Sequence, residues 1–238
     1  MTIMPPMAVL AGGLATRMYP LTEAVPKSML EVAGVPFIDH QLRLFAREGI
    51  TEVVLCLGYL GDKIRDHVGD GSHFGLAIRY SQDGNPLLGT GGALRKATLL
   101  LGREFLVCYG DSYLDISYRP VVEAFRASFK AGLMTVYRNE DAWDASNVEF
   151  DGEKILAYDK VNKNTQMRHI DWGLGVLRTD CIQRWPDNVH FGLDAVYRDL
   201  LKCEELAVQE VHTRFYEIGS RQGLAETDAL LRRQLKLR

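Results

Sequence analysis

A glycine-rich segment and two cations near the N-terminus could together bind phosphate groups. Residues 10–17 read Leu-Ala-Gly-Gly-Leu-Ala-Thr-Arg and follow a short apolar strand predicted over residues 7–10. A loop without bulky side chains lets backbone N–H groups reach phosphate oxygens at the carboxyl end of a strand. Arg17 adds a planar guanidinium and Lys27 a point charge, which suit a polyphosphate. The alternative is a simple tight turn, the commonest role of a Gly-Gly pair after a strand.

A carboxylate follows another apolar strand further along the chain. Residues 105–109 read Phe-Leu-Val-Cys-Tyr, and Asp111 comes shortly after them. A carboxylate that leaves the end of such a strand is well placed for a hard cation bridging phosphates, because Mg²⁺ prefers oxygen ligands. A solvated turn aspartate is the alternative.

Several other chemistries lack the residues they need. Neither Gly-x-Gly-x-x-Gly nor the P-loop pattern is present, since the glycine-rich segment ends in Thr16-Arg17 rather than in Gly-Lys-Ser/Thr. Dinucleotide redox cofactors and P-loop chemistry are therefore disfavoured. The histidines form no pair with metal-ligand spacing, and Cys56 and Cys108 lie in apolar runs typical of reduced core thiols. We expect no zinc site.

Apolar runs and helical stripes alternate along the first half of the chain and must position these residues. Strands that are apolar on both faces and separated by helices indicate a largely parallel sheet between helices. After residue 139 two short strands flank an Asp-Gly turn, which predicts a hairpin. The sequence thus predicts an α/β fold with a mixed, mainly parallel central sheet. The expected strands are 7–10, 52–57, 76–80, 105–109, 133–137, 147–150, 155–158, 172–177 and 206–211; the expected helices are 37–48, 60–68, 91–101, 120–131, 193–203 and 220–235.

Length and charge limit the classes of partner. The chain has 238 residues, 47% of them hydrophobic and 25% charged, which is ordinary for a globular protein. A net charge of −3 gives no overall cationic field for nucleic acid or an anionic membrane, so a phosphate ligand must meet a local site. No stretch approaches the ~20 apolar residues of a membrane span. We expect a cytoplasmic protein without nucleic-acid or membrane partners.

Several of these segments resemble the sugar-1-phosphate nucleotidylyltransferases (NDP-sugar pyrophosphorylases). Residues 10–22 and 26–30 are similar to the family pattern Leu-Ala-Gly-Gly-x-Gly-Thr-Arg-Leu-x-Pro-Leu-Thr followed by Pro-Lys-x-Met or Pro-Lys-x-Leu. The resemblance implies a three-layer, Rossmann-like nucleotide-diphospho-sugar transferase fold. It implies a single domain over 1–238, with a nucleotide-binding part at about 1–138 and a sugar-binding part at about 139–238. Further similar segments are 88–93, 109–112, 158–160, 171–176 and 215–220, so nearly the whole chain is covered.

The resemblance implies a role for each matching residue. Arg17 would bind the triphosphate and the leaving pyrophosphate, and Lys27 the reacting phosphates. Asp111 and Glu217 would hold Mg²⁺. The catalytic set is then Arg17, Lys27 and Asp111; the nucleotide-binding set is Leu10, Ala11, Gly12, Gly13, Thr16, Arg17, Gly89, Thr90, Gly91 and Gly92; and the sugar-phosphate-binding set is Asp111, Lys160, Trp172 and Gly173.

Structural alternatives stand beside some of these roles. The segment at 88–93 could equally cap the helix that follows it, and a lysine at a hairpin end is otherwise merely solvated. Gly175 could be a strand irregularity. Ser220 would N-cap the last helix whatever the function.

The chain departs from the family pattern at a few positions. Ala15 stands where the family usually has glycine, and alanine tolerates positive φ poorly, so the path of the loop is expected to differ slightly. Asp159 and Val161 flank Lys160 where the family has Glu-Lys-Pro. Glu217 replaces an aspartate with a longer carboxylate, which keeps the chemistry but shifts its reach.

The implied reaction joins a nucleoside triphosphate and a sugar 1-phosphate to give an NDP-sugar and pyrophosphate. The nucleophile is already an anion, so positioning and charge neutralisation suffice and no general base is required. The combination of residues 89–93 with 109–112 is most similar to the D-glycero-D-manno-heptose 1-phosphate guanylyltransferases of surface-polysaccharide pathways, which favours GTP. Muramate 1-phosphate uridylyltransferases and mannose 1-phosphate guanylyltransferases share much of this layout.

Two other classes remain as alternatives. A metal-dependent glycosyltransferase is expected to carry an Asp-x-Asp motif, which residues 111–115 are not, and would leave Arg17 and Lys27 unexplained. A regulatory subunit that binds nucleotide sugars without activity should have lost the cations or the carboxylates. No hexapeptide repeat is present, so a C-terminal β-helix with a second activity is not expected. A homodimer is a family-level expectation.

Overall fold

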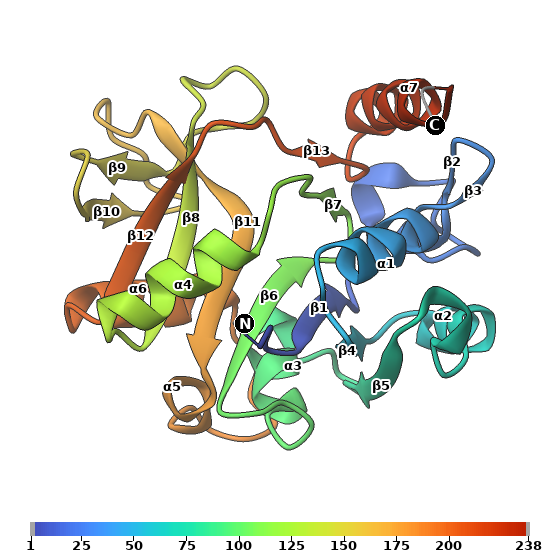
Figure 1. Ribbon diagram of the computed structural model, residues 1–238, viewed down its shortest axis with the longest axis horizontal. Coiled ribbons are helices and arrows are strands. Elements are labelled where there is room, and N and C mark those ends of the chain that lie inside the picture. Colours follow the sequence, from blue (N-terminus) through green and yellow to red (C-terminus); the bar gives the residue numbers. More distant parts are fainter. Residues whose placement is uncertain (1–2, 237–238) are drawn as a thin grey trace.

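A computed structural model describes residues 3–236 and contains a nine-stranded mixed sheet (Figure 1). Its main path has the order β10-β9-β11-β6-β1-β4-β5, and β8 and β12 extend it from β11. β1, β4, β5 and β6 are mutually parallel, and β11 joins them antiparallel to β6. These strands are β1 (Met7–Ala11), β4 (Glu52–Leu57), β5 (Ala77–Gln82), β6 (Glu104–Tyr109), β8 (Gly132–Arg138), β9 (Val148–Phe150), β10 (Ile155–Tyr158), β11 (His169–Arg178) and β12 (Leu206–Val211).

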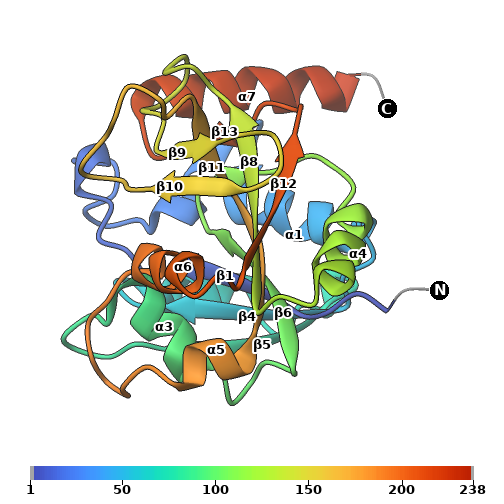
Figure 2. The same ribbon diagram turned by 90° about the vertical axis from the view of Figure 1, so that its left-hand side faces the viewer.

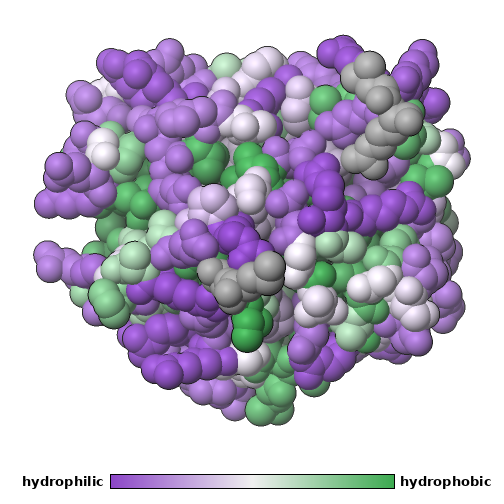
Figure 3. Space-filling model, in the orientation of Figure 1, coloured by the Kyte–Doolittle hydropathy of each residue, from purple (hydrophilic) through white to green (hydrophobic). Residues whose placement is uncertain are grey.

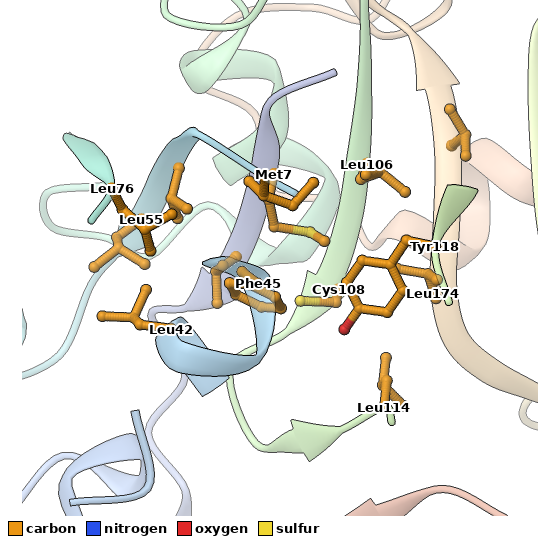
Figure 4. Close-up of a cluster of buried hydrophobic side chains, with 14 of the residues drawn as sticks. Met7, Leu42, Phe45, Leu55, Leu76, Leu106, Cys108, Leu114, Tyr118 and Leu174 are labelled. Atoms are coloured by element: carbon orange, nitrogen blue, oxygen red, sulfur yellow. The ribbon is translucent and has the colours of Figure 1, made fainter. Parts of the chain in front are cut away.

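Helices cover both faces of the sheet (Figure 2). One face packs against α1 (Phe37–Arg47), α2 (Gly61–Val68) and α4 (Arg119–Ser128), and the other against α3 (Gly89–Ala97), α5 (Thr179–Gln183) and α6 (Leu193–Lys202). Because successive side chains of a strand point to opposite faces, β1 places Met7 and Val9 in one core and Ala8 and Leu10 in the other. Figure 4 shows the first of these cores, where Met7 and Leu106 lie near Phe45 of α1 and Tyr118. The prediction of a mixed, mainly parallel sheet between helices is thereby confirmed.

A smaller layer lies beside the sheet, and of its elements only the last helix was predicted. It consists of the hairpin β2 (Glu31–Val32) and β3 (Val35–Pro36), the pair β7 (Ser112–Tyr113) and β13 (Tyr216–Glu217), and the last helix α7 (Arg221–Lys236). Val32, Phe37, Tyr113, Ile218 and Leu231 form its core. Two-residue strands carry too little periodicity to be read from a sequence.

The remaining expectations about elements differ from the structure mainly at their ends. The helix expected over 91–101 begins earlier and ends at Ala97, and β11 is longer than the expected 172–177 because it continues through an irregularity between Asp171 and Gly175. Hairpin β9–β10 is antiparallel, as the Asp-Gly turn predicts. No helix within residues 3–236 is long and apolar enough to cross a membrane. Hydrophilic and hydrophobic residues are interspersed on the face shown in Figure 3.

Candidate active site

A cleft of about 460 Å³ opens at the carboxyl ends of β1, β4, β5 and β6. It brings together segments that are far apart in the sequence, and most of the predicted phosphate-binding residues lie on its walls. Its lining consists of Leu10, Ala11, Gly12, Gly13, Leu14, Ala15, Thr16, Arg17, Pro26, Lys27, Ser28, Cys56, Tyr59, Asp83, Leu87, Gly89, Thr90, Ala93, Tyr109, Gly110, Asp111, His190 and Gly219.

The glycine-rich loop after β1 forms one wall of this cleft. Gly12 is required by close packing, since a Cβ there would lie 2.9 Å from the backbone nitrogen of Gly58. Ala15 adopts the left-handed conformation, with φ 51° and ψ 37°. Its carbonyl accepts hydrogen bonds from the Met18 N–H (3.0 Å) and from the hydroxyl of Thr22 (2.9 Å), which hold it there. The loop therefore follows a glycine-like path despite the alanine, at a cost in backbone strain.

The two predicted cations of the cleft differ in their surroundings. Arg17 lies in the short 3₁₀ turn Thr16–Met18, is exposed, and makes no ion pair with any residue of the described range 3–236. Lys27 begins a second such turn, and its Nζ lies 2.5 Å from Oδ2 of Asp111. Arg17 is thus free to meet an anion, whereas Lys27 is paired with a carboxylate.

The pair β7–β13 brings the two predicted metal-binding carboxylates together. Glu217 is the cross-strand partner of Ser112, and the N–H of Ile218 donates to the carbonyl of Asp111 (3.0 Å). Both carboxylates face Gly219, where a Cβ would lie 2.9 Å from Oε2 of Glu217 and 3.0 Å from Oδ2 of Asp111. A side chain at this position would push them apart.

Glu217 also has a structural role. Its Oε2 accepts the N–H of Gly219, and its Oε1 accepts the hydroxyl of Ser220 at 2.6 Å. Ser220 in turn accepts the N–H of Gly223 at 2.9 Å, which confirms it as the N-cap of α7.

Two carboxylates alone would leave a cation incompletely coordinated. Within residues 3–236 no group of three or more histidine, cysteine, aspartate or glutamate side chains is arranged to hold a metal ion. The pair Asp111 and Glu217 nevertheless fits Mg²⁺, which is commonly held by one or two carboxylates and completes its shell with water and substrate phosphates.

The second glycine-rich segment divides into two parts. Gly89, with φ 73°, and Thr90 line the cleft, although the Thr90 hydroxyl already accepts the N–H of Leu193 at 2.8 Å. Gly91 and Gly92 do not line it, so for them the prediction of nucleotide contact needs correction. Both N–H groups donate to the carbonyl of Phe191 (2.9 and 3.2 Å), and a Cβ at Gly91 would lie 2.3 Å from the Phe191 ring. They are glycines because the loop before α6 packs directly on them.

Of the predicted sugar-phosphate-binding residues, Asp111 lines the cleft, whereas Lys160, Trp172 and Gly173 lie outside its lining. The prediction is wrong for the side chain of Trp172, which is 1% exposed in the core and donates its indole N–H to the Thr213 carbonyl at 2.8 Å. Gly173, with φ 98°, lies near Tyr109 and Ser112. The neighbouring Gly175 is explained by packing, since a Cβ there would clash with the Tyr197 hydroxyl.

Lys160 approaches the cleft through Tyr109. Its Nζ lies 3.1 Å from the Tyr109 hydroxyl and 3.4 Å from Oδ2 of Asp171. Partial burial works against the charged ammonium, but the carboxylate of Asp171 and the Tyr109 hydroxyl outweigh it and raise the pKa of Lys160. Lys160 is therefore a firmly protonated cation beside the cleft.

Among the lining residues that the sequence reasoning missed, Asp83 and His190 carry an acidic and an imidazole side chain. Asp83 follows directly after β5 and is 8% exposed; its Oδ2 accepts the Leu88 N–H at 3.3 Å, while Oδ1 has no hydrogen-bond partner within the described residues. Burial raises the pKa of Asp83. The argument that found Asp111, a carboxylate at a strand's carboxyl end, could have found it. His190 lies in the loop before α6, which no motif marks.

Comparison with known proteins gives one family and several relatives. The nucleotidyl transferase family matches residues 7–156. The N-acetylmuramate alpha-1-phosphate uridylyltransferase of Neisseria meningitidis is 42% identical over 111 residues, which are 46% of this chain and 48% of that protein. The D-glycero-alpha-D-manno-heptose 1-phosphate guanylyltransferase of Campylobacter jejuni is 33% identical over 108 residues, which are 45% of this chain and 48% of that protein.

The matched part of this chain thus spans about half the length of these two relatives. Among solved structures, a putative glucose-1-phosphate thymidylyltransferase from Bacillus anthracis in complex with a sucrose superposes with a TM-score of 0.83 at 21% identity, and covers 95% of each chain. At that identity the likeness concerns the fold, which is of the Rossmann-like kind.

Proposed function

Because this chain belongs to the nucleotidyl transferase family, we propose that it transfers a nucleotidyl group from a nucleoside triphosphate to a sugar 1-phosphate and releases pyrophosphate. The observation that carries the proposal is the convergence of Arg17, Lys27 and Asp111 on one cleft beside a glycine-rich loop. This arrangement supplies two cations and a carboxylate where a triphosphate can lie along backbone N–H groups.

The proposed chemistry is an in-line displacement at the α-phosphorus. A phosphate oxygen of the sugar 1-phosphate attacks, the bond to the β-phosphate oxygen breaks, and pyrophosphate leaves. Arg17 binds the triphosphate and stabilises the charge that develops on the leaving pyrophosphate. The ammonium of Lys27 leaves its ion pair with Asp111 and binds the reacting phosphates. Lys160 holds the phosphate of the sugar.

Asp111 and Glu217 would hold Mg²⁺, which when bound neutralises charge on the phosphates. The convergence of both carboxylates on Gly219 supports this assignment. The nucleotide-binding part at about 1–138 and the sugar-binding part at about 139–238 then form one catalytic domain.

Asp83 supports GTP as the nucleotide. A base whose edge donates hydrogen bonds would satisfy the unpartnered Oδ1 of this buried carboxylate in the cleft wall. Guanine carries two neighbouring donors, N1–H and N2–H, that match the two oxygens of a carboxylate, whereas uracil and thymine place one N–H between two carbonyl oxygens. On this ground we propose GTP as the nucleotide. By similarity to the heptose relative, we propose D-glycero-D-manno-heptose 1-phosphate as the acceptor.

The second candidate is a muramate 1-phosphate uridylyltransferase, which the higher identity of the uridylyltransferase relative favours. A mannose 1-phosphate guanylyltransferase would use the same nucleotide, GTP, as the proposed heptose enzyme but a different sugar. The protein should be incubated with an equal mixture of four nucleoside triphosphates and each sugar 1-phosphate in turn, and the products analysed by mass spectrometry. A GDP-heptose product is expected. A UDP-sugar as the main product would overturn the assignment of the base.

A further inference from the structure

Lys160 lies in an environment that fixes its position. It directly follows the hairpin β9–β10, where Asp159 accepts the N–H groups of Val161 and Asn162 and thereby shapes the turn. Its side chain turns inward, with Nζ 5.1 Å from the centre of the Tyr109 ring and 5.9 Å from that of Tyr158. A lysine at a hairpin end would otherwise lie in solvent, so some group must hold it inward.

Asp171 on β11 is that group. Its side chain is 3% exposed, and its Oδ2 lies 3.4 Å from Nζ of Lys160 and accepts the Tyr158 hydroxyl at 3.2 Å. Its Oδ1 accepts the N–H of Gly173 at 3.1 Å, where β11 departs from regular pairing. Burying a carboxylate is costly unless it is paired and hydrogen-bonded, and all of these partners stabilise it.

The carboxylate connects three elements at the edge of the cleft. It contacts Lys160 after β10 and Gly173 in the irregular part of β11 directly. It reaches the end of β6 only through Lys160, whose ammonium donates to the Tyr109 hydroxyl. Asp171 itself is too buried to meet a substrate in this position. Its effect on a ligand must therefore pass through Lys160.

We infer that Asp171 is a positioning residue that holds the Lys160 ammonium at the edge of the cleft for the phosphate of the sugar 1-phosphate. The identity of the ligand rests on the proposed function, whereas the contact between Asp171 and Lys160 is independent of it. The raised pKa of Lys160 is consistent with it, because the carboxylate favours the charged amine. The side chain of Asp171 thus sets where the phosphate of the acceptor binds, while the triphosphate is bound elsewhere in the cleft.

The test compares Asp171→Asn with Tyr158→Phe. Asp171→Asn removes the negative charge that holds Lys160 but keeps an oxygen that can accept the N–H of Gly173. Tyr158→Phe removes the hydroxyl that donates to Asp171 but keeps the charges of Asp171 and Lys160. Asp171→Asn is expected to raise KM for the sugar 1-phosphate about tenfold, with KM for the triphosphate unchanged, and Tyr158→Phe to leave both nearly unchanged. An equal rise in both KM values would overturn the inference.

A double-mutant cycle with Lys160→Met shows whether Asp171 acts through this lysine. In the Lys160→Met background, Asp171→Asn should have no further effect on KM for the sugar 1-phosphate. A full tenfold effect in that background would contradict the inference.

A second readout needs no substrate. Labelling of Lys160 by an amine-reactive reagent, followed by peptide mass spectrometry, should be about ten times faster in Asp171→Asn than in the wild type at neutral pH, since loss of the carboxylate lowers the pKa of the amine. Unchanged labelling would refute the positioning role. If no sugar 1-phosphate is turned over by the wild type, the proposed function fails while the labelling still decides the role of Asp171.

Discussion

Among single residues, the cleft holds one cation that is free and one that is already paired. Arg17 has no ion-pair partner within the described residues, whereas Lys27 forms a close pair with Asp111 whose two side chains are 22% and 21% exposed. Phosphates that bind between them must compete with Asp111 for the ammonium of Lys27. The pairing therefore balances the charge of Lys27 until a triphosphate brings its own charge.

Substitution of Asp111 by asparagine tests the carboxylate directly. We expect turnover to fall by about a thousandfold, the scale for removing one electrostatic group from an active site. The melting temperature should change little, because the side chain is partly exposed and Asn fills the same volume. Pyrophosphate release and thermal unfolding followed by circular dichroism would measure the two effects. Near-normal turnover would exclude Asp111 as the metal ligand.

Substitution of Asp83 by asparagine should separate stability from base recognition. The folded protein raises the pKa of Asp83 by burial, so the charged form costs stability, and this cost grows as the pH rises through the raised pKa. Below the ordinary value of about 4 both states are protonated and the cost vanishes. At neutral pH the variant should therefore be more stable by about 1 kcal/mol, measured by urea unfolding.

The same variant should lose preference for GTP. Asparagine offers only one acceptor oxygen, so we expect kcat/KM for GTP to fall by about tenfold to a hundredfold while the value for UTP changes little. An unchanged ratio between the two nucleotides would contradict a base-reading role. A stability difference between the variant and the wild type that is the same at neutral and acidic pH would contradict the buried charge of Asp83.

Among the elements, the two-residue pair β7–β13 creates the carboxylate pair. Gly219→Ala would place a Cβ within 3.0 Å of both Asp111 and Glu217 and force them apart. We expect turnover to fall by about a hundredfold with secondary structure intact. Gly102→Ala is the matched control, since its Cβ would meet nothing closer than 3.9 Å. Equal activity of the two variants would show that the carboxylates need not converge.

The glycine-rich loop contains a second testable feature, the left-handed Ala15. Ala33 has nearly the same conformation (φ 49° against 51°) but lies outside the cleft lining in the turn between β2 and β3. Both Ala15→Gly and Ala33→Gly should stabilise the fold by about 0.5 kcal/mol, because relief of strain exceeds the entropy of the added glycine. Only Ala15→Gly should change KM for the triphosphate. Destabilisation by both variants would show that the alanines carry no strain.

How far the sequence could predict these elements depends on the length of each pattern. The strand before Gly12 and the strand before Asp111 are apolar runs of several residues, so their carboxyl ends, and with them the cleft, were predictable. The convergence of Glu217 on Asp111 was expected only from the family resemblance, because β7 and β13 are too short to show a period. Trp172 was placed in the sugar-phosphate-binding set through the resemblance of its segment, and a motif carries no information on whether a side chain is buried; its indole lies in the core.

On the scale of the whole molecule, one sheet connects the two proposed parts. β11 pairs with β6 and β8 of the first part and with β9 of the second, so Asp111 after β6 and Lys160 after β10 are held in one rigid frame. The last helix returns to the first part through β13 and Gly219. We therefore expect the triphosphate and the sugar 1-phosphate to meet where these parts join.

The proposed activity of this chain is the transfer of a nucleotidyl group to a sugar 1-phosphate. The most direct test is continuous measurement of pyrophosphate release by the purified wild-type protein with Mg²⁺, each nucleoside triphosphate and a panel of sugar 1-phosphates, with Asp111→Asn as the inactive reference. Release should require both substrates and Mg²⁺, be fastest with GTP, and be absent in the variant. No release with any pair by a folded protein that still binds nucleotide would contradict the claim and favour a regulatory subunit that binds nucleotide sugars.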